Sequence, residues 1–550
     1  MRRLMRVVMC MCLLVSVTGL MAQGIKSSGQ VVYNVTDYGV VSDGETMNTE
    51  KIQAVIDDVA AAGGGTVYFP PGKYLTGTIF LKSHINLHLE NGAVILGSLD
   101  INDYKAVGVE RLNHSARQQR HLIYAGDEEG IAITGRGIVD GRGPEFWPKD
   151  FRTMTEIEIR GAMTQPDGFS TRPGGYVVIQ NCTDVWIENV TFRDSPHHMM
   201  KIINCTDVVL HGMSIEQGVY EDDGPNTDGL AISGFNIRIS DCKFTTGDDC
   251  MVISGAEHFT MSNCTFTTTE SAIVMSGSKG GLKSVAISNC SILDAGGAFT
   301  IRPGRENVID GVTVSNINYR LDRQMGGNLI FCRAKPIEVR ESVTSWAEKW
   351  NIKVKPDDGP PPKIRNMTFS NITASGDGAI FMDGLPDSWI ENITLENIKF
   401  HMRGAIPKPD SAVPPHPYYI FGHHFAPYGI FCRYIKNLTM RNIRFTWNEP
   451  EKAEWGSALR VWDGANIEID GFNGRQSLGS DRAAIELQNV QGAFIRNGYA
   501  AEGTGTFLHL NGSSNVTLMN NHLGNALQVL KYADGSSADD VAMHGNITGK

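Results

Sequence analysis

Ile239-Ser240-Asp241-Cys242-Lys243-Phe244 is one copy of a short pattern that recurs along the middle of this chain. The pattern places an Asn or Asp among apolar residues that alternate with polar ones. It returns as Met261-Ser262-Asn263-Cys264-Thr265-Phe266 and as Ile287-Ser288-Asn289-Cys290-Ser291-Ile292. Later copies contain Asn316, Asn371, Asn397 and Asn442. The steps are 22 residues from Asp241 to Asn263, 26 to Asn289 and 27 to Asn316.

A period of roughly 22 to 27 residues, with one short strand pattern at each return, predicts a solenoid. The sequence between the strands has no helical pattern, which disfavours a leucine-rich horseshoe or a βα repeat. A parallel β-helix fits better, because each coil cannot bury its apolar face alone and stacking produces one continuous core. We expect the recurring Asn and Asp residues to stack at a turn and to form hydrogen bonds along the ladder.

Three of the repeats carry a cysteine at the same phase, at Cys242, Cys264 and Cys290. Of the ten cysteines, eight remain after residue 22, and an exported protein with eight cysteines suggests a disulfide framework. The shared phase instead favours buried cysteines that act as small apolar side chains in the core. We therefore expect a stack of free thiols, with disulfides as the alternative.

The overall charge and the N-terminus restrict the class of protein. A formal net charge of −11 over 550 residues argues against a nucleic-acid binder, although local basic residues could still line a cleft for an acidic sugar. Residues 1–22 have the pattern of a secretory signal, with Arg2, Arg3 and Arg6 before an apolar stretch and Ala22 at the expected cleavage site. A membrane anchor is the alternative, but the apolar run is short for a span. No later segment is apolar enough to span a membrane, so we expect an exported (periplasmic or extracellular) mature protein.

Residues 23–550 are predicted to form a single parallel β-helix domain with an N-terminal capping helix. Apolar residues recur at helical spacing at Ile52, Val55, Ile56 and Val59. Asn48 or Thr49 is the expected N-cap of this helix, and the glycine run 63–65 ends it. Two stretches break the repeat, near 335–363 and 403–430, and we expect them to project as long loops.

Two motifs bring three aspartates together: Asn226-Thr227-Asp228-Gly229 and Gly247-Asp248-Asp249-Cys250. If the backbone between them makes one coil, Asp228 and Asp248 lie on neighbouring rungs, about 5 Å apart. Such a cluster is costly, because like charges disfavour joint ionisation. A glycosidase needs such a cluster, because one carboxyl donates a proton and another acts as base for water. We expect this reaction to use no metal or cofactor. A ladder of Asx turns or a calcium site is the alternative.

The two aspartate motifs resemble those of glycoside hydrolase family 28, the polygalacturonase family of right-handed parallel β-helices. The resemblance extends over roughly residues 32–445 and includes Tyr38-Gly39, Asp43-Gly44, the segment 63–74 and the segment 133–141. It implies hydrolysis with inversion, in which Asp248 protonates the glycosidic oxygen while Asp228 and Asp249 hold and deprotonate the water. The physical logic agrees, because two ionised neighbours raise the pKa of the third carboxyl. Asn226 would then position a carboxylate or a sugar hydroxyl.

Two further motifs depart from the family pattern. Ala272 stands where the family has a histidine, and Thr300-Ile301-Arg302 stands where it has Arg-Ile-Lys for the substrate carboxylate. Rhamnogalacturonan hydrolases of the family also lack the histidine. The resemblance therefore implies that the hydrolytic centre is retained while the contacts with the substrate differ from those used on plain galacturonan.

Basic residues after the aspartates can still bind a uronate, because arginine holds a carboxylate in a bidentate manner. We expect substrate binding by Lys279, Arg302 and Arg305. His198, about one coil before Asp228, is expected to touch the sugar, and Glu270 is a candidate to replace a lost polar group.

The sequence thus predicts an exported inverting glycoside hydrolase that acts on a polysaccharide or oligosaccharide containing uronic acid. The glycan would be of pectic, galacturonan or rhamnogalacturonan type, and the two long loops would narrow the cleft towards exo-cleavage. One alternative is a polysaccharide lyase on the same fold, with calcium held by Asp222, Asp223, Asp248 and Asp249. The other is an inactive glycan-binding β-helix, in which the missing histidine marks a dead site.

Overall fold

A computed structural model of the chain describes most of residues 31–549. The description leaves out 108–119, 155–157, 159–161, 163–170, 220–222, 278–279, 324–326, 335–358, 405–427 and 449–454. The predicted signal at 1–22 and most of the two predicted loops, 335–363 and 403–430, therefore lie outside the described residues. None of the described helices is long and apolar enough to cross a membrane.

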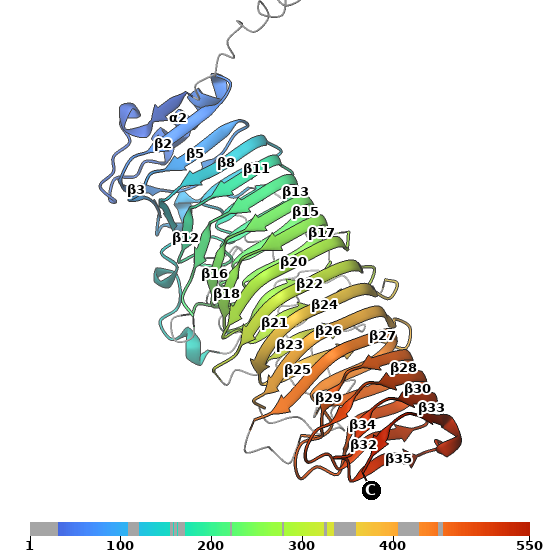
Figure 1. Cartoon of the computed structure of the whole chain (residues 1–550). Helices are drawn as coiled ribbons and strands as arrows, with labels where there is room; N and C mark the ends of the chain where they lie inside the picture. The colour runs from blue at the N-terminus through green and yellow to red at the C-terminus, as the bar shows by residue number, and fades with distance from the viewer. Residues whose placement is uncertain are drawn as a thin grey trace, which may run out of the picture.

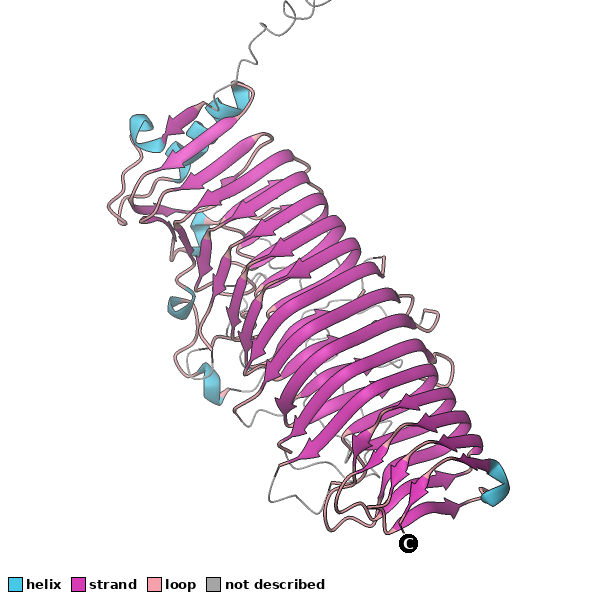
Figure 2. Cartoon of the chain, in the orientation of Figure 1, coloured by secondary structure: helices cyan, strands magenta, loops and turns pink. Residues whose placement is uncertain are grey.

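The described chain forms one elongated stack of coils, with the N-terminal part at one end and the C-terminal part at the other (Figure 1). Thirty-seven strands in the described residues are linked into one sheet, and every pairing between named strands is parallel, from β1 against β2 to β34 against β37. Strands run along the whole stack, while helix is confined to short segments at its edges (Figure 2). The parallel β-helix expected from the repeat is thereby confirmed.

The strands form three columns. The first, called here the site sheet, contains β4 (Ile79–Phe80), β7 (Ile123–Gly126), β10 (Val177–Gln180), β19 (Ser271–Met275), β21 (Gly297–Ile301), β23 (Asn328–Arg333), β25 (Gly378–Asp383), β32 (Thr506–Asn511) and β35 (Gln528–Ala533). The second contains β1 (Val32–Asn34), β2 (Gly65–Phe69), β5 (Ile85–Leu89), β8 (Glu129–Gly135), β11 (Thr183–Glu188), β20 (Leu282–Leu293), β22 (Val308–Arg320), β24 (Lys363–Gly376), β26 (Ile390–Met402), β33 (Ser514–Met519) and β36 (Val541–His544). The third contains β3 (Gly72–Thr76), β6 (Ala93–Gly97), β9 (Ile138–Asp140), β12 (Thr191–Arg193), β14 (Ser214–Glu216), β16 (Lys243–Thr246), β18 (Thr265–Thr268), β29 (Asn473–Gly474), β31 (Tyr499–Ala500), β34 (His522–Leu523) and β37 (Ile547–Thr548). Six long strands begin in the site sheet and continue into the second column: β13 (Met200–His211), β15 (Leu230–Ser240), β17 (Met251–Ser262), β27 (Ile430–Trp447), β28 (Leu459–Asp470) and β30 (Ala483–Arg496).

The recurring asparagines form the predicted ladder. Asn371 Nδ2 donates to Asn316 Oδ1 at 3.1 Å, and Asn397 Nδ2 donates to Asn371 Oδ1 at 3.0 Å. Each member sits in the left-handed region, with φ of 56° at Asn316 and 55° at Asn371, which Asn tolerates better than other residues with a side chain. A second ladder, which the repeat analysis missed, runs from Asp310 through Asn366, Asn392, Asn437 and Asn466.

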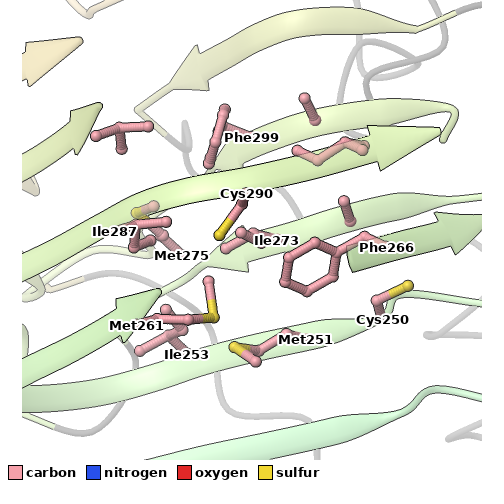
Figure 3. Close-up of a cluster of buried hydrophobic side chains, with 14 of the residues drawn as sticks. Cys250, Met251, Ile253, Met261, Phe266, Ile273, Met275, Ile287, Cys290 and Phe299 are labelled. Carbon is pink, nitrogen blue, oxygen red and sulfur yellow. The ribbon is translucent and has the colours of Figure 1, made fainter. Parts of the chain in front are cut away.

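The cysteines confirm the expectation of free, buried thiols. All eight cysteines in the described part of the chain are buried and free of disulfides, including Cys242, Cys264 and Cys290. Figure 3 shows Cys250 and Cys290 among the apolar side chains of neighbouring rungs. These thiols therefore fill space in the core, as the shared phase of the repeat predicts.

The helix predicted after residue 48 is present as α2 (Thr49–Ala61), at the N-terminal end of the stack (Figure 1). Its buried face consists of Ile52, Val55, Ile56 and Val59, and it packs against β2, β4 and β5. Asn48 is the N-cap by position but its side chain makes no capping hydrogen bond, because it binds both the N–H and the C=O of Val41 instead. The capping role of the helix stays a prediction. Short 3-10 turns occur at η1 (Val35–Tyr38), η2 (Ile101–Asp103), η4 (Gly143–Glu145), η5 (Phe151–Thr153) and η9 (Ala538–Asp540).

Candidate active site

The three aspartates lie directly before two neighbouring strands of the site sheet. Leu230 of β15 pairs with Met251 of β17, so Asp228 and Asp249 occupy equivalent positions on adjacent rungs. The N–H of Gly229 donates to the carbonyl of Asp249 at 2.9 Å and fixes this register. One coil separates the two motifs, as the sequence predicts.

Close packing of the turns explains the glycines in both motifs. A Cβ on Gly229 would lie 2.4 Å from the carbonyl oxygen of Cys250. A Cβ on Gly247 would lie 2.6 Å from both the Thr227 hydroxyl and the Cβ of Asp223. Neither contact is tolerable, so glycine at these positions lets the two turns approach and brings the carboxylates together.

The carboxyl groups form one compact cluster. One oxygen from each of Asp228, Asp248 and Asp249 lies within 4.8 Å of the others. A basic group stands at each end of the cluster: His198 Nε2 is 3.3 Å from Asp228 Oδ1, and Arg302 Nη2 is 3.3 Å from Asp249 Oδ2. Asp248 Oδ1 instead accepts the backbone N–H of Asp249 at 2.8 Å. Among the described residues, no Lys, Arg or His lies within ion-pair distance of Asp248.

Burial and mutual repulsion raise the pKa of all three carboxyls. Burial raises the pKa of Asp248 to about 7, with the charges of Asp249 and Glu270 adding to the effect. Burial and the charges of Asp248 and Asp249 raise the pKa of Asp228 well above its ordinary value. Burial also raises the pKa of Asp249, although the charge of Arg302 lowers it in part. Because the groups titrate together, the cluster as a whole retains protons at pH values where isolated carboxyls have already released theirs.

Two of the predicted binding residues, His198 and Arg302, reach the aspartates as described above. Asn226 adopts a left-handed conformation with φ of 57°, and its Oδ1 accepts from Arg172 Nη2 at 3.2 Å. Arg305 is directed elsewhere: its Nε donates to the carbonyl of Gly359, and its Nη2 lies 3.6 Å from Asp387. Lys279 lies outside the described residues.

Ala272, which stands where the family has a histidine, is packed in the core. Ala272 has no exposed surface and belongs to the main hydrophobic core. Its neighbour Ser271 contacts the aspartates instead, since its backbone N–H donates to Asp249 Oδ1 at 3.1 Å. The charge of Glu270 also acts on Asp248 and Asp249, so the interpretation of Glu270 as a polar member of this site is consistent with the structure.

Sequence reasoning missed Lys201, a partly buried residue of β13. Burial lowers its pKa, while the carboxylate of Asp228 favours the charged form and partly offsets that effect. The signal was available in the repeat, because Lys201 alternates with the core residues Met200 and Ile202 and therefore faces outward, one rung before Asp228.

The same cluster is the only group in the described chain with the geometry of a metal site. Its three carboxylate oxygens are hard donors of the kind that calcium prefers, but calcium takes six to eight oxygen ligands. Of the other two ligands named for the lyase alternative, Asp222 lies outside the described residues and Asp223 faces Arg152 at 3.9 Å. The described residues thus supply three of the ligands that a calcium ion would need.

Comparison with known proteins gives the chain a family. Residues 108–412 match the family profile described as Glycosyl hydrolases family 28, and residues 32–97 match one described as Rhamnogalacturonase A/epimerase, pectate lyase-like. A probable polygalacturonase from Vitis vinifera is 31% identical over 232 residues, which cover 40% of this chain and 43% of that protein. An exo-poly-alpha-D-galacturonosidase from Dickeya chrysanthemi is 27% identical over 252 residues, which cover 40% of this chain and 41% of that protein. The chain thus aligns with about two fifths of the length of these relatives.

A solved structure supports the fold. The chain superposes on the hyperthermoactive exopolygalacturonase of Thermotoga maritima with a TM-score of 0.55 and 20% identity, over 76% of this chain and 92% of that one. At this identity the likeness concerns the fold alone. The family profile, by contrast, spans more than half of the chain and includes all three aspartates. The chain therefore belongs to glycosyl hydrolases family 28.

Proposed function

We propose that this protein hydrolyses the glycosidic bonds of a glycan that contains uronic acid. The observation that carries the proposal is the carboxylate cluster, in which oxygens of Asp228, Asp248 and Asp249 lie within 4.8 Å of one another. A proton donor and a base are the groups that glycoside hydrolysis requires. Arg302, at one end of the cluster, adds a guanidinium that suits the carboxylate of a uronate.

The positions of the cations support the roles. Arg302 favours the ionised form of Asp249, and Lys201 favours that of Asp228, beside which His198 Nε2 lies at 3.3 Å. Asp248 has no ion pair among the described residues, and burial with the charges of Asp249 and Glu270 brings its pKa to about 7, although its bond to the Asp249 N–H and the charge of Arg302 act in the opposite direction. Asp248 is therefore proposed as the acid that protonates the leaving oxygen, while Asp228 and Asp249 hold and deprotonate the water.

Inversion at the anomeric carbon is the second part of the proposal. It is supported by the family resemblance and by the presence of two carboxylates, rather than one, to hold the water. The spacing alone would fit retention, because carboxyl groups stand about 5 Å apart in retaining enzymes and roughly 6.5–9.5 Å apart in inverting ones. Proton NMR of the freshly released product distinguishes the two, since inversion gives first the anomer opposite to that of the substrate.

The substrate class and the location complete the proposal. The names of the relatives, a polygalacturonase and an exo-poly-alpha-D-galacturonosidase, support a pectic substrate and exo-cleavage. Residues 1–22 support export from the cytoplasm, because basic residues precede an apolar stretch there. Mass spectrometry of the mature N-terminus tests the export proposal, which predicts cleavage after Ala22.

The decisive experiment compares the wild-type protein with Asp248→Asn on galacturonan, rhamnogalacturonan and short uronate oligosaccharides. We expect the wild type to release reducing ends and the variant to lose at least 10²-fold in kcat, because general acid catalysis contributes about 10²–10⁴-fold. The variant should remain folded, since asparagine can still accept the N–H of Asp249. Wild-type turnover by Asp248→Asn would refute the assignment.

The same assay separates the two alternatives. A calcium-dependent lyase would give unsaturated products that absorb in the ultraviolet and would lose activity with a chelator. The hydrolase gives no such absorbance and tolerates the chelator. An inactive glycan-binding protein would bind the oligosaccharides without releasing any reducing end.

A further inference from the structure

Beyond Arg302, the outward face of the site sheet carries a row of charged residues. Ile301 pairs with Cys332, so Arg302 and Arg333 are neighbours in this row, roughly 5 Å apart along the stack. The next two rungs continue the row, since Arg333 pairs with Asp383 and Asp383 pairs with Arg433. The row thus begins at the proposed uronate-binding arginine and leads away from the aspartates.

Arg333 points away from the core. Phe331 lies two residues earlier on β23 and therefore faces the same side as Arg333. Phe331 belongs to a second apolar cluster, separate from the main core, in which its ring stacks on Phe381 at 5.3 Å and Phe381 stacks on Phe431 at 5.3 Å. Arg333 consequently sits on the outer face, beside stacked rings that keep water away from it.

Asp383 lies closer to Arg433 than to Arg333 and accepts a hydrogen bond from Arg433. Arg433 Nε donates to Asp383 Oδ1 at 2.9 Å, and its guanidinium also lies over the rings of Tyr434 and Trp462, at 4.9 and 5.4 Å. Arg333 Nε is 3.5 Å from Asp383 Oδ2 and makes no hydrogen bond there. Within the described part of the chain, Arg433 thus has a hydrogen bond and two ring contacts, whereas Arg333 has only its ion pair with Asp383.

Arg333 is buried, and two of its nitrogen atoms have unused hydrogen-bond donors. The residue is only 3% exposed, yet its Nε and Nη1 have no hydrogen-bond acceptor among the described residues. A buried donor without a partner costs about 1–3 kcal/mol, and more when it is charged. The charges do not balance either, because Arg333, Asp383 and Arg433 together carry a net charge of +1. A buried guanidinium with unused N–H donors can bind an anion through those donors.

We infer that Arg333 forms a second carboxylate-binding site, beyond Arg302, for a further uronate of the same glycan chain. The inference rests on the proposed function, because the anion in question is part of that substrate. It assigns the glycan beyond the cleaved bond to the rungs of β23 to β27, on the C-terminal side of the aspartates. Specificity for acidic over esterified or neutral glycans would then depend on Arg333 as well as on Arg302.

Binding is measured by calorimetry on Asp248→Asn, whose turnover is expected to be at least 10²-fold slower than that of the wild type. The ligands are galacturonate, its dimer, trimer and tetramer, and the methyl esters of the same oligomers. Adding Arg333→Gln should weaken the binding of the longer acids about tenfold and leave the monomer and the esters unchanged, whereas Arg333→Lys should restore part of the loss. Equal weakening of acids and esters, or no weakening, would overturn the inference. Inorganic phosphate is titrated alongside these ligands, and a loss confined to phosphate would also overturn the inference, because it would show a site for a free anion.

Stability provides a second readout, with Arg433 as the matched control. Asp383 keeps its hydrogen bond to Arg433 when Arg333 is replaced, and the unmet donors of Arg333 are removed, so Arg333→Gln and Arg333→Met should unfold at about the same temperature as the wild type. Arg433→Gln should unfold at a lower one, because it removes a hydrogen bond and two ring contacts. A loss of folding or stability in both Arg333 variants would assign Arg333 to the structure and overturn the inference.

The two proposals fail in different ways. A wild type that cleaves galacturonan, combined with an Arg333→Gln protein that binds long acids normally, refutes only the second site. A wild type that neither binds nor cleaves any uronate oligomer refutes the proposed function and the second site with it.

Discussion

Replacing Asp248 with asparagine should stabilise the protein at neutral pH while it removes activity. Burial and the charges of Asp249 and Glu270 raise the pKa of Asp248 from its ordinary value of 3.8 to about 7. Between these two values the folded chain holds a proton that the unfolded chain has released. The free energy of unfolding of the wild type therefore falls as the pH rises through this window. Asparagine does not ionise, so the variant escapes this loss.

The size of the effect follows from the pKa difference. Each pKa unit corresponds to about 1.36 kcal/mol, so a rise of about three units gives at most roughly 4 kcal/mol in favour of Asp248→Asn above pH 7. The actual gain is smaller to the extent that the partly buried carboxyl is screened by water. Below about pH 4 both chains carry a neutral group at this position, and the difference should vanish.

The assay is urea denaturation of both proteins at pH 3.5, 5, 6, 7 and 8, with the difference in unfolding midpoint followed against pH. Asp310→Asn is a control of opposite sign. Partial burial would raise the pKa of Asp310, but hydrogen bonds from Asn366 and Arg365 outweigh it and hold that pKa below its ordinary value. The control should be less stable than the wild type at neutral pH, and its deficit should disappear in acid. A pH-independent difference for Asp248→Asn would refute the reasoning.

Two further changes test the cluster and the ladder. Arg302→Gln should lower kcat/KM on acidic glycans by about 10–10²-fold, because hydrogen bonds to charged groups are worth about 1.5–3 kcal/mol. It should also move the acidic limb of the pH profile upward, since Arg302 lowers the pKa of Asp249. Asn371→Ala should reduce the free energy of unfolding by about 1–2 kcal/mol without changing kcat, because it breaks hydrogen bonds to Asn316 and Asn397.

Matched variants serve as controls for both changes. Arg365→Gln removes an exposed guanidinium that pairs with Asp310, and it should leave kcat/KM unchanged. If it lowers kcat/KM as much as Arg302→Gln does, the loss reflects overall charge. Asn371→Gly keeps the left-handed backbone accessible and loses only the ladder bonds, so it should cost less than Asn371→Ala. Equal stability of the wild type and Asn371→Ala would refute the role of the ladder.

Local and periodic features could be predicted from the sequence. The repeat of roughly 22 to 27 residues, the buried phase of Cys242, Cys264 and Cys290 and the helix near residue 52 all depend on near neighbours in the chain. The two aspartate motifs were also placed correctly on adjacent rungs, because one regular coil separates them. Asn48 is the N-cap by position, as predicted, but the sequence does not show that a contact with Val41 uses its side chain in place of a capping hydrogen bond.

By itself, then, the sequence determined the β-helix, its core and the three carboxylates of the cluster, because a repeated coil turns sequence spacing directly into spatial distance. Only the tertiary structure showed which aspartate His198 and Arg302 each contact, that Lys201 lies nearby and that Arg305 is directed elsewhere. Arg302 meets Asp249 across 53 residues, and Arg433 meets Asp383 across 50. The break at 403–430 separates Asp383 from Arg433, so the register of that pair cannot be counted from the repeat. The unsatisfied guanidinium of Arg333 follows from that stacking, and no local pattern in the sequence indicates it.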